Sequence, residues 1–460
     1  MPIAVVLLAA GKGTRMNSDL PKVLHPLAGV PLLAHALAAA RSVEPERIVL
    51  VTGHGADEVA AAAEALEPGI TVTVQERQLG TGHAVTQAEA ALAEFDGDVI
   101  VLYGDTPFIR PETLKHMLAA RTGGAEVVVL GFEAANSSCY GRIACDADGP
   151  ARIVEPGDPD HARLTEAPAN SGVVVADRSV LFNLLAAVRP DNAKSEYYLT
   201  DLVGLAREQG LRTAMILCPE AETLGVNSRS DLAAAEAIFQ TAARAAAMEN
   251  GVTLIAPETV FFALDTVVGR DVVIEPNVYF AAGVTVESGA LIHGFCHFAD
   301  CHISRGAEVG PYARLRPGAE IAEDVKIGNF VEVKNAYVDE GAKVNHFSYI
   351  GDATVGSKSN IGAGTIICNY DGVSKHRTEI GPRVFIGSNT ALVAPLTIGR
   401  DAMIAAGSVI TEDVPAEALA LGRARQEVKP GLGFRIMERL RAAKAAKAAK
   451  AAARTTEANA

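Results

Sequence analysis

The run ISRGAE-VGPYAR-LRPGAE-IAEDVK-IGNFVE (residues 303–332) consists of five consecutive blocks of six residues. Each block begins with an aliphatic residue, and a small residue usually follows. A period of six fits neither a helix nor an alternating strand. It is typical of a parallel β-helix, in which each block forms one flat face and its aliphatic residue points into the prism. A generic β-sandwich would not keep this register over so many blocks, so we predict the β-helix.

The same rhythm extends toward the C-terminus. It resumes in the pairs Ile350-Gly, Val355-Gly, Ile361-Gly, Ile380-Gly, Ile386-Gly and Ile398-Gly, and it ends near Ile404 and Ile410. The corners of such coils need small residues or positive φ angles, which explains why the chain has 42 glycines. The register breaks at a polar insertion, Cys368–Glu379. Loops that leave a rigid scaffold often carry function.

The N-terminal half follows a different rule, in which short aliphatic runs alternate with helix-like segments. We predict strands at Ile3–Leu8, Ile48–Thr52, Thr71–Val74, Val99–Tyr103 and Val127–Gly131. We predict helices at Pro31–Ser42, Asp57–Ala65, Gly82–Phe95 and Pro111–Arg121. This alternation indicates an α/β, Rossmann-like domain with a parallel sheet, and the continuous aliphatic strands indicate that both faces are covered.

An Ala-rich run, Asp231–Asn250, separates the two patterns and predicts a single connecting helix that Gly251 ends. We therefore expect an α/β domain at 1–228, a helical linker at 229–250 and a hexapeptide-repeat domain at 251–425. Residues 426–460 form a C-terminal segment whose Ala-Ala-Lys repeats are of low complexity, and the sequence suggests no function for them.

Composition restricts the classes of function. A net charge of -14 argues against non-specific binding to nucleic acid, which needs a basic face. The six cysteines are too sparse to staple 460 residues, which fits a reducing, cytoplasmic compartment. The apolar start, Met1–Ala10, lacks the Lys or Arg that precedes the apolar stretch of a signal peptide. We therefore interpret it as a buried strand. No apolar run is long enough to span a bilayer, so we expect no membrane partner.

The first strand leads into LAAGKGTRM (8–16), and Pro21-Lys22 follows shortly after. Gly11 and Gly13 would let the backbone approach a phosphate with exposed N–H groups, while Arg15 and Lys22 add positive charge. The pattern is neither a P-loop nor a dinucleotide-binding motif. Asp105 ends a predicted strand, where sheets of this kind bind ligands. Taken alone, Asp105 is as consistent with an ordinary turn residue as with a binding residue. Together with the glycine loop and Lys22, it indicates a phosphate-binding site.

These motifs resemble a known family. LAAGKGTRM with PKVL (21–24) is similar to nucleotidyltransferases that join nucleoside triphosphates to sugar phosphates. Further matching segments are Gln75, Gly80-Thr81-Gly82, Tyr103-Gly104-Asp105, Tyr140-Gly141-Arg142, Glu155, Asn170-Ser171-Gly172, Glu196–Asp201 and Gly225-Val226-Asn227. With the hexapeptide repeats included, residues 3 to 430 closely resemble the bacterial bifunctional N-acetylglucosamine-1-phosphate uridyltransferase/glucosamine-1-phosphate acetyltransferases. Lys194-Ser195 departs from the family, in which Gln-Gly is commoner, and the departure concerns the details of sugar contact.

The resemblance implies roles for residues of the N-terminal domain. Asp105 and Asn227 would hold Mg²⁺, and Arg15 and Lys22 would act on the triphosphate and the attacked phosphorus. The implied residues that bind UTP and the sugar phosphate are Leu8, Ala9, Ala10, Gly11, Lys22, Gln75, Gly80, Thr81, Tyr103, Gly104, Asp105, Gly141, Glu155, Asn170 and Asn227. The attacking group is a phosphate monoester that is already largely ionised at neutral pH, so the reaction needs positioning and charge neutralisation rather than a base.

Acetyl transfer to an amine differs, because an amine with a pKa near 8 must lose a proton, and histidine is well suited to accept it. By resemblance His346 is this base. Arg316 and Lys334 would bind the phosphate of glucosamine-1-phosphate, and Tyr349 and Asn360 would contact its sugar. The implied residues of the acetyl-CoA site are Ala363, Asn369, Tyr370, Ser388, Ala406 and Arg423.

The resemblance thus implies two reactions that make UDP-N-acetylglucosamine, a precursor of peptidoglycan and lipopolysaccharide. Acetyl-CoA would acetylate glucosamine-1-phosphate, and UTP would react with the resulting N-acetylglucosamine-1-phosphate to release pyrophosphate. It also implies a left-handed β-helix and a homotrimer with acetyl-transfer sites between subunits. One alternative is a monofunctional nucleotidyltransferase with a structural or regulatory β-helix, against which His346, Arg316 and Lys334 argue. Another is a non-enzymatic scaffold, which would not need Asp105, Asn227 or Lys22.

A cluster of possible zinc ligands lies within the expected hexapeptide-repeat domain: His293, Cys296, His297, Cys301 and His302. Its spacing is not that of a usual structural zinc motif. In six-residue coils these side chains would fall on different faces. We therefore interpret them as structural residues.

Overall fold

The computed structural model describes residues 1–135, 140–192 and 194–458. These residues form two compact units, Met1–Val338 and Asp339–Ala460. The first unit contains the α/β domain, the connecting helix and the earlier coils of the repeat region. The second contains the later coils and a C-terminal helix.

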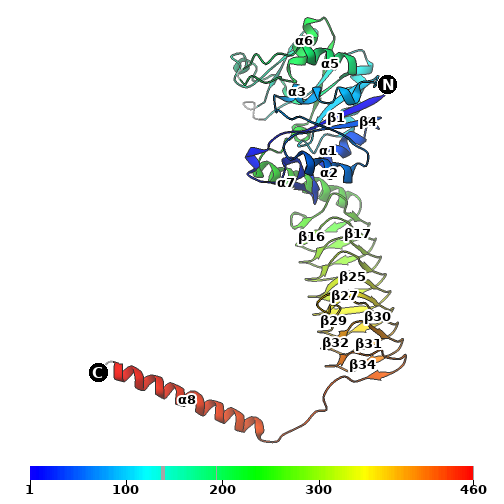
Figure 1. Cartoon of the computed structure of the whole chain (residues 1–460). Coiled ribbons are helices and arrows are strands. Elements are labelled where there is room, and N and C mark those ends of the chain that lie inside the picture. The colour runs from blue at the N-terminus through cyan, green and yellow to red at the C-terminus, as the bar shows by residue number, and fades with distance from the viewer. Residues whose placement is uncertain (136–139, 193, 459–460) are drawn as a thin grey trace. The chain divides into compact units, whose positions relative to one another are not determined.

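The α/β domain is built on one sheet with the strand order β11-β7-β10-β6-β1-β4-β5. Figure 1 labels β1 and β4 of this sheet. The central strands β1, β4, β5 and β6 are parallel, as predicted. The strands of this sheet are β1 Ile3–Ala9, β4 Arg47–Thr52, β5 Thr71–Val74, β6 Asp98–Tyr103, β7 Val127–Phe132, β8 Arg142–Asp146, β9 Gly149–Val154, β10 Ala169–Asp177 and β11 Thr213–Cys218. A small separate ribbon pairs β2 Pro26–Leu27 with β3 Val30–Pro31.

The five predicted strands run in the same direction, but the sheet also contains strands that were not predicted, and one of these reverses the direction. Strand β10 runs antiparallel to both β6 and β7, and β8 pairs antiparallel with β9. An aliphatic run shows that a strand is buried but not which way it runs, because direction depends on the connections. The sheet is therefore mixed, as is common in large α/β domains.

Helices cover both faces of the sheet, and each face has its own apolar core. One core lies under α3, α5 and α6, and the other under α1, α2 and α4. The helices are α1 Leu32–Arg41, α2 Ala56–Leu66, α3 Thr81–Thr86, α4 Pro111–Thr122, α5 Arg178–Ala187 and α6 Asp201–Glu208. Strand residues such as Val5 and Val6 are fully buried against opposite cores, which confirms that both faces are covered.

The helix predicted at Gly82–Phe95 is broken. Helix α3 ends at Thr86, and only a short 3₁₀ turn, η3 Ala90–Leu92, follows it. The Thr86 hydroxyl and the Gln87 amide both donate to the His83 carbonyl, at 2.8 and 2.9 Å. Side chains that bond a backbone carbonyl in this way compete with the helical ladder, which explains the early end.

The connecting helix is α7, Arg229–Glu249, and it begins with a capping box in which Ser228 and Asp231 bond each other's backbone N–H groups. Its middle contacts the first coil, because the Gln240 amide donates to the Phe262 carbonyl at 2.6 Å and accepts from the Phe262 N–H at 2.9 Å. The sequence prediction of Asp231–Asn250 was correct to within two residues at the start and one at the end.

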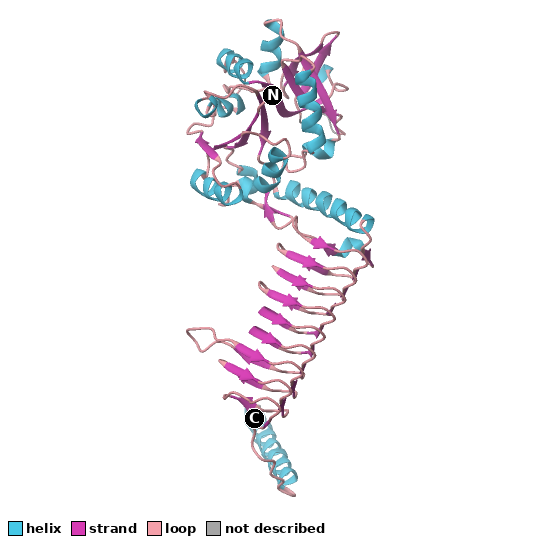
Figure 2. Cartoon of the chain, turned by 90° about the vertical axis from the view of Figure 1, so that its right-hand side faces the viewer, coloured by secondary structure: helices cyan, strands magenta, loops and turns pink. Residues whose placement is uncertain are grey.

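The coils of the first unit consist of short strands that pair in parallel with strands one turn later (Figure 2). Val273 pairs with Leu291 and Glu308 with Lys326, so one turn takes eighteen residues, or three blocks of six. These strands are β12 Thr253–Leu254, β13 Val260–Phe261, β14 Val267–Val268, β15 Val273–Ile274, β16 Val278–Phe280, β17 Val284–Val286, β18 Leu291–Ile292, β19 His297–Phe298, β20 Cys301–Ile303, β21 Glu308–Val309, β22 Arg314–Leu315, β23 Ala319–Ile321, β24 Lys326–Asn329 and β25 Glu332–Val338.

The second unit continues with the same kind of coil. Thr378 pairs with Leu396, again eighteen residues on, whereas Ala353 pairs with Thr378 after twenty-five. The seven extra residues fall within the predicted insertion Cys368–Glu379, whose two ends belong to β29 and β30. The strands are β26 Lys343–His346, β27 Tyr349–Val355, β28 Asn360–Ile361, β29 Ile366–Cys368, β30 Thr378–Ile380, β31 Phe385–Ile386, β32 Ala391–Val393, β33 Leu396–Ile398, β34 Met403–Ile404, β35 Val409–Ile410 and β36 Leu419–Ala420.

The aliphatic residues that begin the blocks point into the coils, as predicted. Ile303, Val309 and Leu315 are fully buried in the first unit, as are Ile350 and Ile386 in the second. The repeat region is therefore a parallel β-helix of hexapeptide repeats, of the left-handed class.

The histidines and cysteines near residue 300 lie on different strands and have other partners. His293 follows β18, His297 is in β19, and His302 in β20 contacts Glu287 at 3.0 Å. Cys296 and Cys301 are buried thiols whose pKa values burial raises.

His293 joins three coils and should make their stability depend on pH. Nδ1 lies 3.1 Å from Glu275 and Nε2 lies 3.2 Å from Glu308, which also contacts Lys326 at 2.6 Å. Burial alone would lower the pKa of His293, but the bonds to Glu308 and Glu275 outweigh it, and the net shift is upward from 6.5. The imidazolium therefore stabilises the fold fully below pH 6.5, and this contribution is lost as the pH rises through the folded-state pKa.

We expect His293→Gln to lower the stability of the coils by up to about 1 kcal/mol at pH 5.5 and by much less at pH 8.5. Urea unfolding of both proteins at the two pH values measures this difference. An equal loss at both pH values would contradict the imidazolium assignment.

The last element is α8, Leu432–Ala458, which carries the Ala-Ala-Lys repeats. Among the helices of the described residues, none combines the length and apolar character that a membrane span requires.

Candidate functional site

A cavity of about 530 Å³ opens at the carboxyl ends of the parallel strands β1 and β6. Thirteen of the predicted nucleotide- and sugar-binding residues line it: Leu8, Ala9, Ala10, Gly11, Lys22, Gln75, Gly80, Thr81, Tyr103, Asp105, Gly141, Glu155 and Asn170. Gly104 lies between two lining residues. Asn227 reaches the site through Lys22, as described next.

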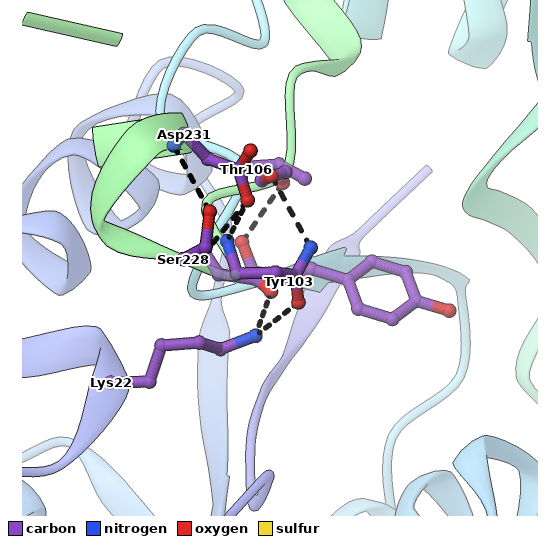
Figure 3. Close-up of polar contacts among 8 residues, drawn as sticks. Lys22, Tyr103, Thr106, Ser228 and Asp231 are labelled. Atoms are coloured by element: carbon purple, nitrogen blue, oxygen red, sulfur yellow. Dashed lines mark hydrogen bonds and ion pairs between the residues drawn. The ribbon is translucent and has the colours of Figure 1, made fainter. Parts of the chain in front are cut away.

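Lys22 joins the two residues that the resemblance implies as metal ligands. Its ammonium group forms an ion pair with Asp105 Oδ2 and donates to Asn227 Oδ1 at 3.1 Å (Figure 3). Both oxygens thus face one positive charge, although the two residues are 122 positions apart in the sequence. A carboxylate and an amide oxygen that converge in this way are suitable ligands for Mg²⁺.

Two backbone contacts and the cap of α7 fix this pair. The Val226 N–H donates to the Asp105 carbonyl at 2.9 Å, which ties the two loops together. The N–H groups of Asn227 and Ser228 donate to Asp231 Oδ2 at 3.0 and 2.9 Å. The capping box that starts the helix therefore also holds Asn227 in place.

The glycine loop depends on its second glycine. Gly13 has a φ of +59°, and a Cβ there would lie 2.8 Å from the Cβ of Lys22. The loop can therefore pack against Lys22 only because residue 13 has no side chain. Arg15, in the 3₁₀ turn η1 Thr14–Met16, is exposed and does not line the cavity, so its assignment as a catalytic residue stays a prediction.

Part of the cavity lining presents the Gln75 amide and the Thr81 hydroxyl. Gln75 is buried, and its Nε2 donates to the Gly80 carbonyl at 3.1 Å. Thr81 Oγ1 accepts from the Leu199 N–H at 3.1 Å. Gly80 has a φ of +110°, and a Cβ there would lie 2.5 Å from the Tyr197 carbonyl, so this turn also requires glycine. Groups of this kind suit the recognition of a base edge.

Another part of the lining is acidic and hydroxyl-rich. Glu155 Oε1 accepts from the Thr200 hydroxyl at 2.9 Å, and Oε2 would lie 3.3 Å from a Cβ at Gly141. Burial, with further contributions from Asp105 and Glu155, raises the pKa of Tyr103, so its hydroxyl stays protonated. Carboxylate, amide and phenol groups are suitable partners for sugar hydroxyls.

Sequence reasoning missed some of the lining. Lys194, Tyr198, Thr200 and Gln78 also face the cavity. Three of these lie in or beside Glu196–Asp201, a matching segment to which no role was given. Lys194 is the residue that departs from the family pattern, and its place in the lining gives that departure a direct bearing on ligand contact.

In the first unit, the two predicted phosphate-binding residues occupy one column of the β-helix. Arg314 pairs with Glu332 and Leu315 with Val333, which places Arg316 beside Lys334 on the next coil. Arg316 donates to Glu332 at 2.8 Å, a contact that the sequence did not suggest. Two adjacent cations suit a phosphate dianion.

In the second unit, the strand register aligns His346 with three predicted acetyl-CoA residues. Lys343 pairs with Asn360, Asn360 with Phe385, and Phe385 with Met403. His346 and the residues just after the strands, Ala363, Ser388 and Ala406, each lie three positions beyond a paired residue. Backbone bonds from Gly364 to His346, from Asn389 to Ala363 and from Gly407 to Ser388 continue the register and place these four residues in one column. Arg423 extends this column, because its guanidinium donates to the Ala406 carbonyl at 2.6 Å.

A second group lies at the base of the insertion. Asn369 is buried and donates to Tyr349 Oη at 3.4 Å and to the carboxylate of Asp352. Tyr370 is exposed, and its hydroxyl donates to the Gly372 carbonyl within the insertion. Asn360 lies at the start of β28, one residue before the buried Ile361. The register thus brings the predicted sugar and acetyl-CoA residues of this unit onto neighbouring coils.

Fold and site together define a sugar nucleotidyltransferase domain joined to a hexapeptide-repeat domain. Residues 5–196 match the MobA-like NTP transferase domain, and residues 297–418 match the GMPPB C-terminal domain. A solved UDP-glucose pyrophosphorylase complexed with UDP-glucose aligns with 53% of the chain at 20% identity and a TM-score of 0.43, too loosely to inform the site.

Full-length relatives identify the family. A Bifunctional protein GlmU of Paracoccus denitrificans is 59% identical over 96% of this chain and 99% of its own length. One of Cereibacter sphaeroides is 62% identical over 96% of this chain and 97% of its own length. One of Jannaschia sp. is 59% identical, with the same coverage as the second. The chain belongs to the family of the bifunctional protein GlmU.

Proposed function

We propose that the N-terminal cavity is the uridylyl-transfer site and that the predicted residues of the coils form the acetyl-transfer site. As a member of this family, the chain is a bifunctional enzyme of UDP-N-acetylglucosamine synthesis with uridyltransferase and acetyltransferase activities. The observation that best supports the division is the convergence of Lys22, Asp105 and Asn227 on one point of a nucleotide-sized cavity.

In the N-terminal site, the chain's contribution is to hold two anions together. The glycine loop would present N–H groups to the triphosphate, and Lys22 would neutralise charge at the attacked phosphorus. Asp105 and Asn227 would hold Mg²⁺, which supplies further charge neutralisation to the phosphates when bound. Gln75, Gly80 and Thr81 would read the uracil, and Gly141, Glu155 and Asn170 would hold N-acetylglucosamine-1-phosphate.

In the acetyl-transfer site, Arg316 and Lys334 would bind the phosphate of glucosamine-1-phosphate, while Tyr349 and Asn360 contact the sugar. His346 would take a proton from the amine, so that nitrogen attacks the thioester carbonyl of acetyl-CoA and the thiol leaves. The column His346, Ala363, Ser388 and Ala406 supports this assignment, because acetyl-CoA bound along the column would lie beside the proposed base, His346. Asn369, Tyr370 and Arg423 complete the proposed donor site.

The remaining assignments follow from the family and the substrates. The enzyme would act in the cytoplasm, where UTP and acetyl-CoA occur, and the described cysteines are all free thiols. It would assemble as a homotrimer. The proposed division into 1–228, 229–250, 251–425 and 426–460 assigns one reaction to each of the two large domains.

Metal removal should separate the two activities. We expect EDTA to abolish pyrophosphate release from UTP and N-acetylglucosamine-1-phosphate, because only that site would use Mg²⁺. Thiol release from acetyl-CoA with glucosamine-1-phosphate should continue within about twofold of its normal rate. Equal loss of both, restored by Mg²⁺, would contradict the proposed division.

A further inference from the structure

Arg229, at the start of α7, makes two contacts with the loop that carries Lys22. Its Nε donates to the Met16 carbonyl at 3.2 Å, and its Nη1 donates to His25 Nδ1 at 3.2 Å. Met16 ends the 3₁₀ turn η1, and His25 directly follows the turn η2 Lys22–Leu24. The two contacts therefore lie at the two ends of the segment that contains Lys22.

The backbone of this segment bonds mainly within its own turns, apart from the Leu32 N–H, which donates to the His25 carbonyl at 3.0 Å. Residues 17–20 are exposed, and Asn17 has a φ of 47°. The backbone bonds Leu24–Pro21 and His25–Lys22 join residues three positions apart, so they shape the turn but do not fix it on the sheet. A contact from a capped helix can supply that fixed point.

His25 is suited to receive this contact. It is 2% exposed, and burial first and Arg229 second lower its pKa. A guanidinium group only donates, so Nδ1 must be the acceptor and the neutral ring carries its proton on Nε2. The buried ring thus offers Arg229 an acceptor in a fixed place, two residues beyond the buried Val23.

Arg229 also lies two residues after Asn227, between Ser228 and Asp231, the two residues of the capping box that holds Asn227. The start of α7 therefore positions Asn227 directly, and it positions Lys22 through the loop that carries Lys22. We infer that Arg229 is a positioning residue for uridylyl transfer, which keeps the Lys22 ammonium at Asp105 and Asn227. The inference rests on the proposed role of Lys22.

The test compares Arg229→Ala and Arg229→Lys in the full-length enzyme. A small misplacement of a group at the reacting phosphorus lowers the rate of the chemical step, so kcat of uridylyl transfer should fall about 10- to 100-fold in Arg229→Ala. KM for UTP should change less than about threefold, and acetyl transfer should stay near its normal rate. Lysine keeps the charge but loses the planar fork, so Arg229→Lys should show an intermediate kcat.

A matched control is Arg244→Ala in the same helix. Arg244 likewise makes two contacts, donating to the backbone carbonyls of Gln240 and Pro257 at 2.8 and 2.9 Å. These contacts lie away from the cavity lining, so both activities should stay within about twofold of the wild type. A comparable loss of uridylyl transfer in this variant would overturn the inference.

Other outcomes also decide the matter. A normal kcat in Arg229→Ala, or a loss confined to KM, would overturn the inference. If Arg229→Ala loses both activities, Arg229→Lys decides: a selective fall in kcat supports the role, and a normal kcat overturns it. Lys22→Ala tests the role of Lys22 separately from that of Arg229. Normal uridylyl transfer in that variant would refute the proposed role of Lys22 itself.

Discussion

Replacing His346 with Ala is expected to lower the rate of acetyl transfer about 10²- to 10⁴-fold while uridylyl transfer stays near normal. The amine of glucosamine-1-phosphate is partly protonated at neutral pH, and its attack on acetyl-CoA requires a base. His346 ends β26 and lies in the column of the proposed acetyl-CoA residues. Thiol release and pyrophosphate release, measured on the same preparation, give the two rates.

A matched control is His302→Ala, which removes another histidine of the coils. His302 contacts Glu287 and has no place in the proposed site, so both reactions should proceed within about twofold of normal. Equal loss of both reactions in His346→Ala would refute the division of labour. Loss of acetyl transfer in His302→Ala would show that coil histidines act through stability instead.

Replacing Asp105 with Ala should have the converse effect, with uridylyl transfer reduced at least about 100-fold and acetyl transfer retained. The change removes the carboxylate that faces Lys22 and would bind Mg²⁺. Asp105→Asn tests charge separately from shape, because its oxygen can still accept from Lys22 while its negative charge is lost. Pyrophosphate release at several Mg²⁺ concentrations measures both effects.

For the metal assignment, Asp105→Asn should need far more Mg²⁺ than the wild type to reach half its maximal rate. Unchanged formation of the UDP-sugar by Asp105→Ala would end the assignment. A loss of acetyl transfer in the same variant would show that the replacement disturbs more than the N-terminal site.

The repeat region could be predicted from the sequence almost completely. The structure of each coil depends on residues that are close in the sequence. Ile303 and Val309, for example, are buried by their own blocks and by the blocks one turn away. Even the insertion was visible as a break in the rhythm. The direction of β10 was not predictable in this way, because an aliphatic run gives burial without orientation.

The candidate site was predictable only in part. Motifs named residues such as Lys22, Asp105 and Asn227, and the fold brings these three together. Arg229 and Thr200 were missed because their importance lies in a contact with a residue far away in the sequence. The sequence around a single arginine at the start of a helix does not indicate which distant loop the arginine contacts.

The central claim is that two separate sites on one chain perform successive reactions, and mixing the two defective variants tests it most directly. His346→Ala and Asp105→Ala are each supplied with glucosamine-1-phosphate, acetyl-CoA and UTP, alone and together. Each alone should form almost no UDP-N-acetylglucosamine, and the mixture should form it readily, because N-acetylglucosamine-1-phosphate can leave one enzyme and enter the other. A mixture as inactive as its components, although each retains its own partial reaction, would contradict the account.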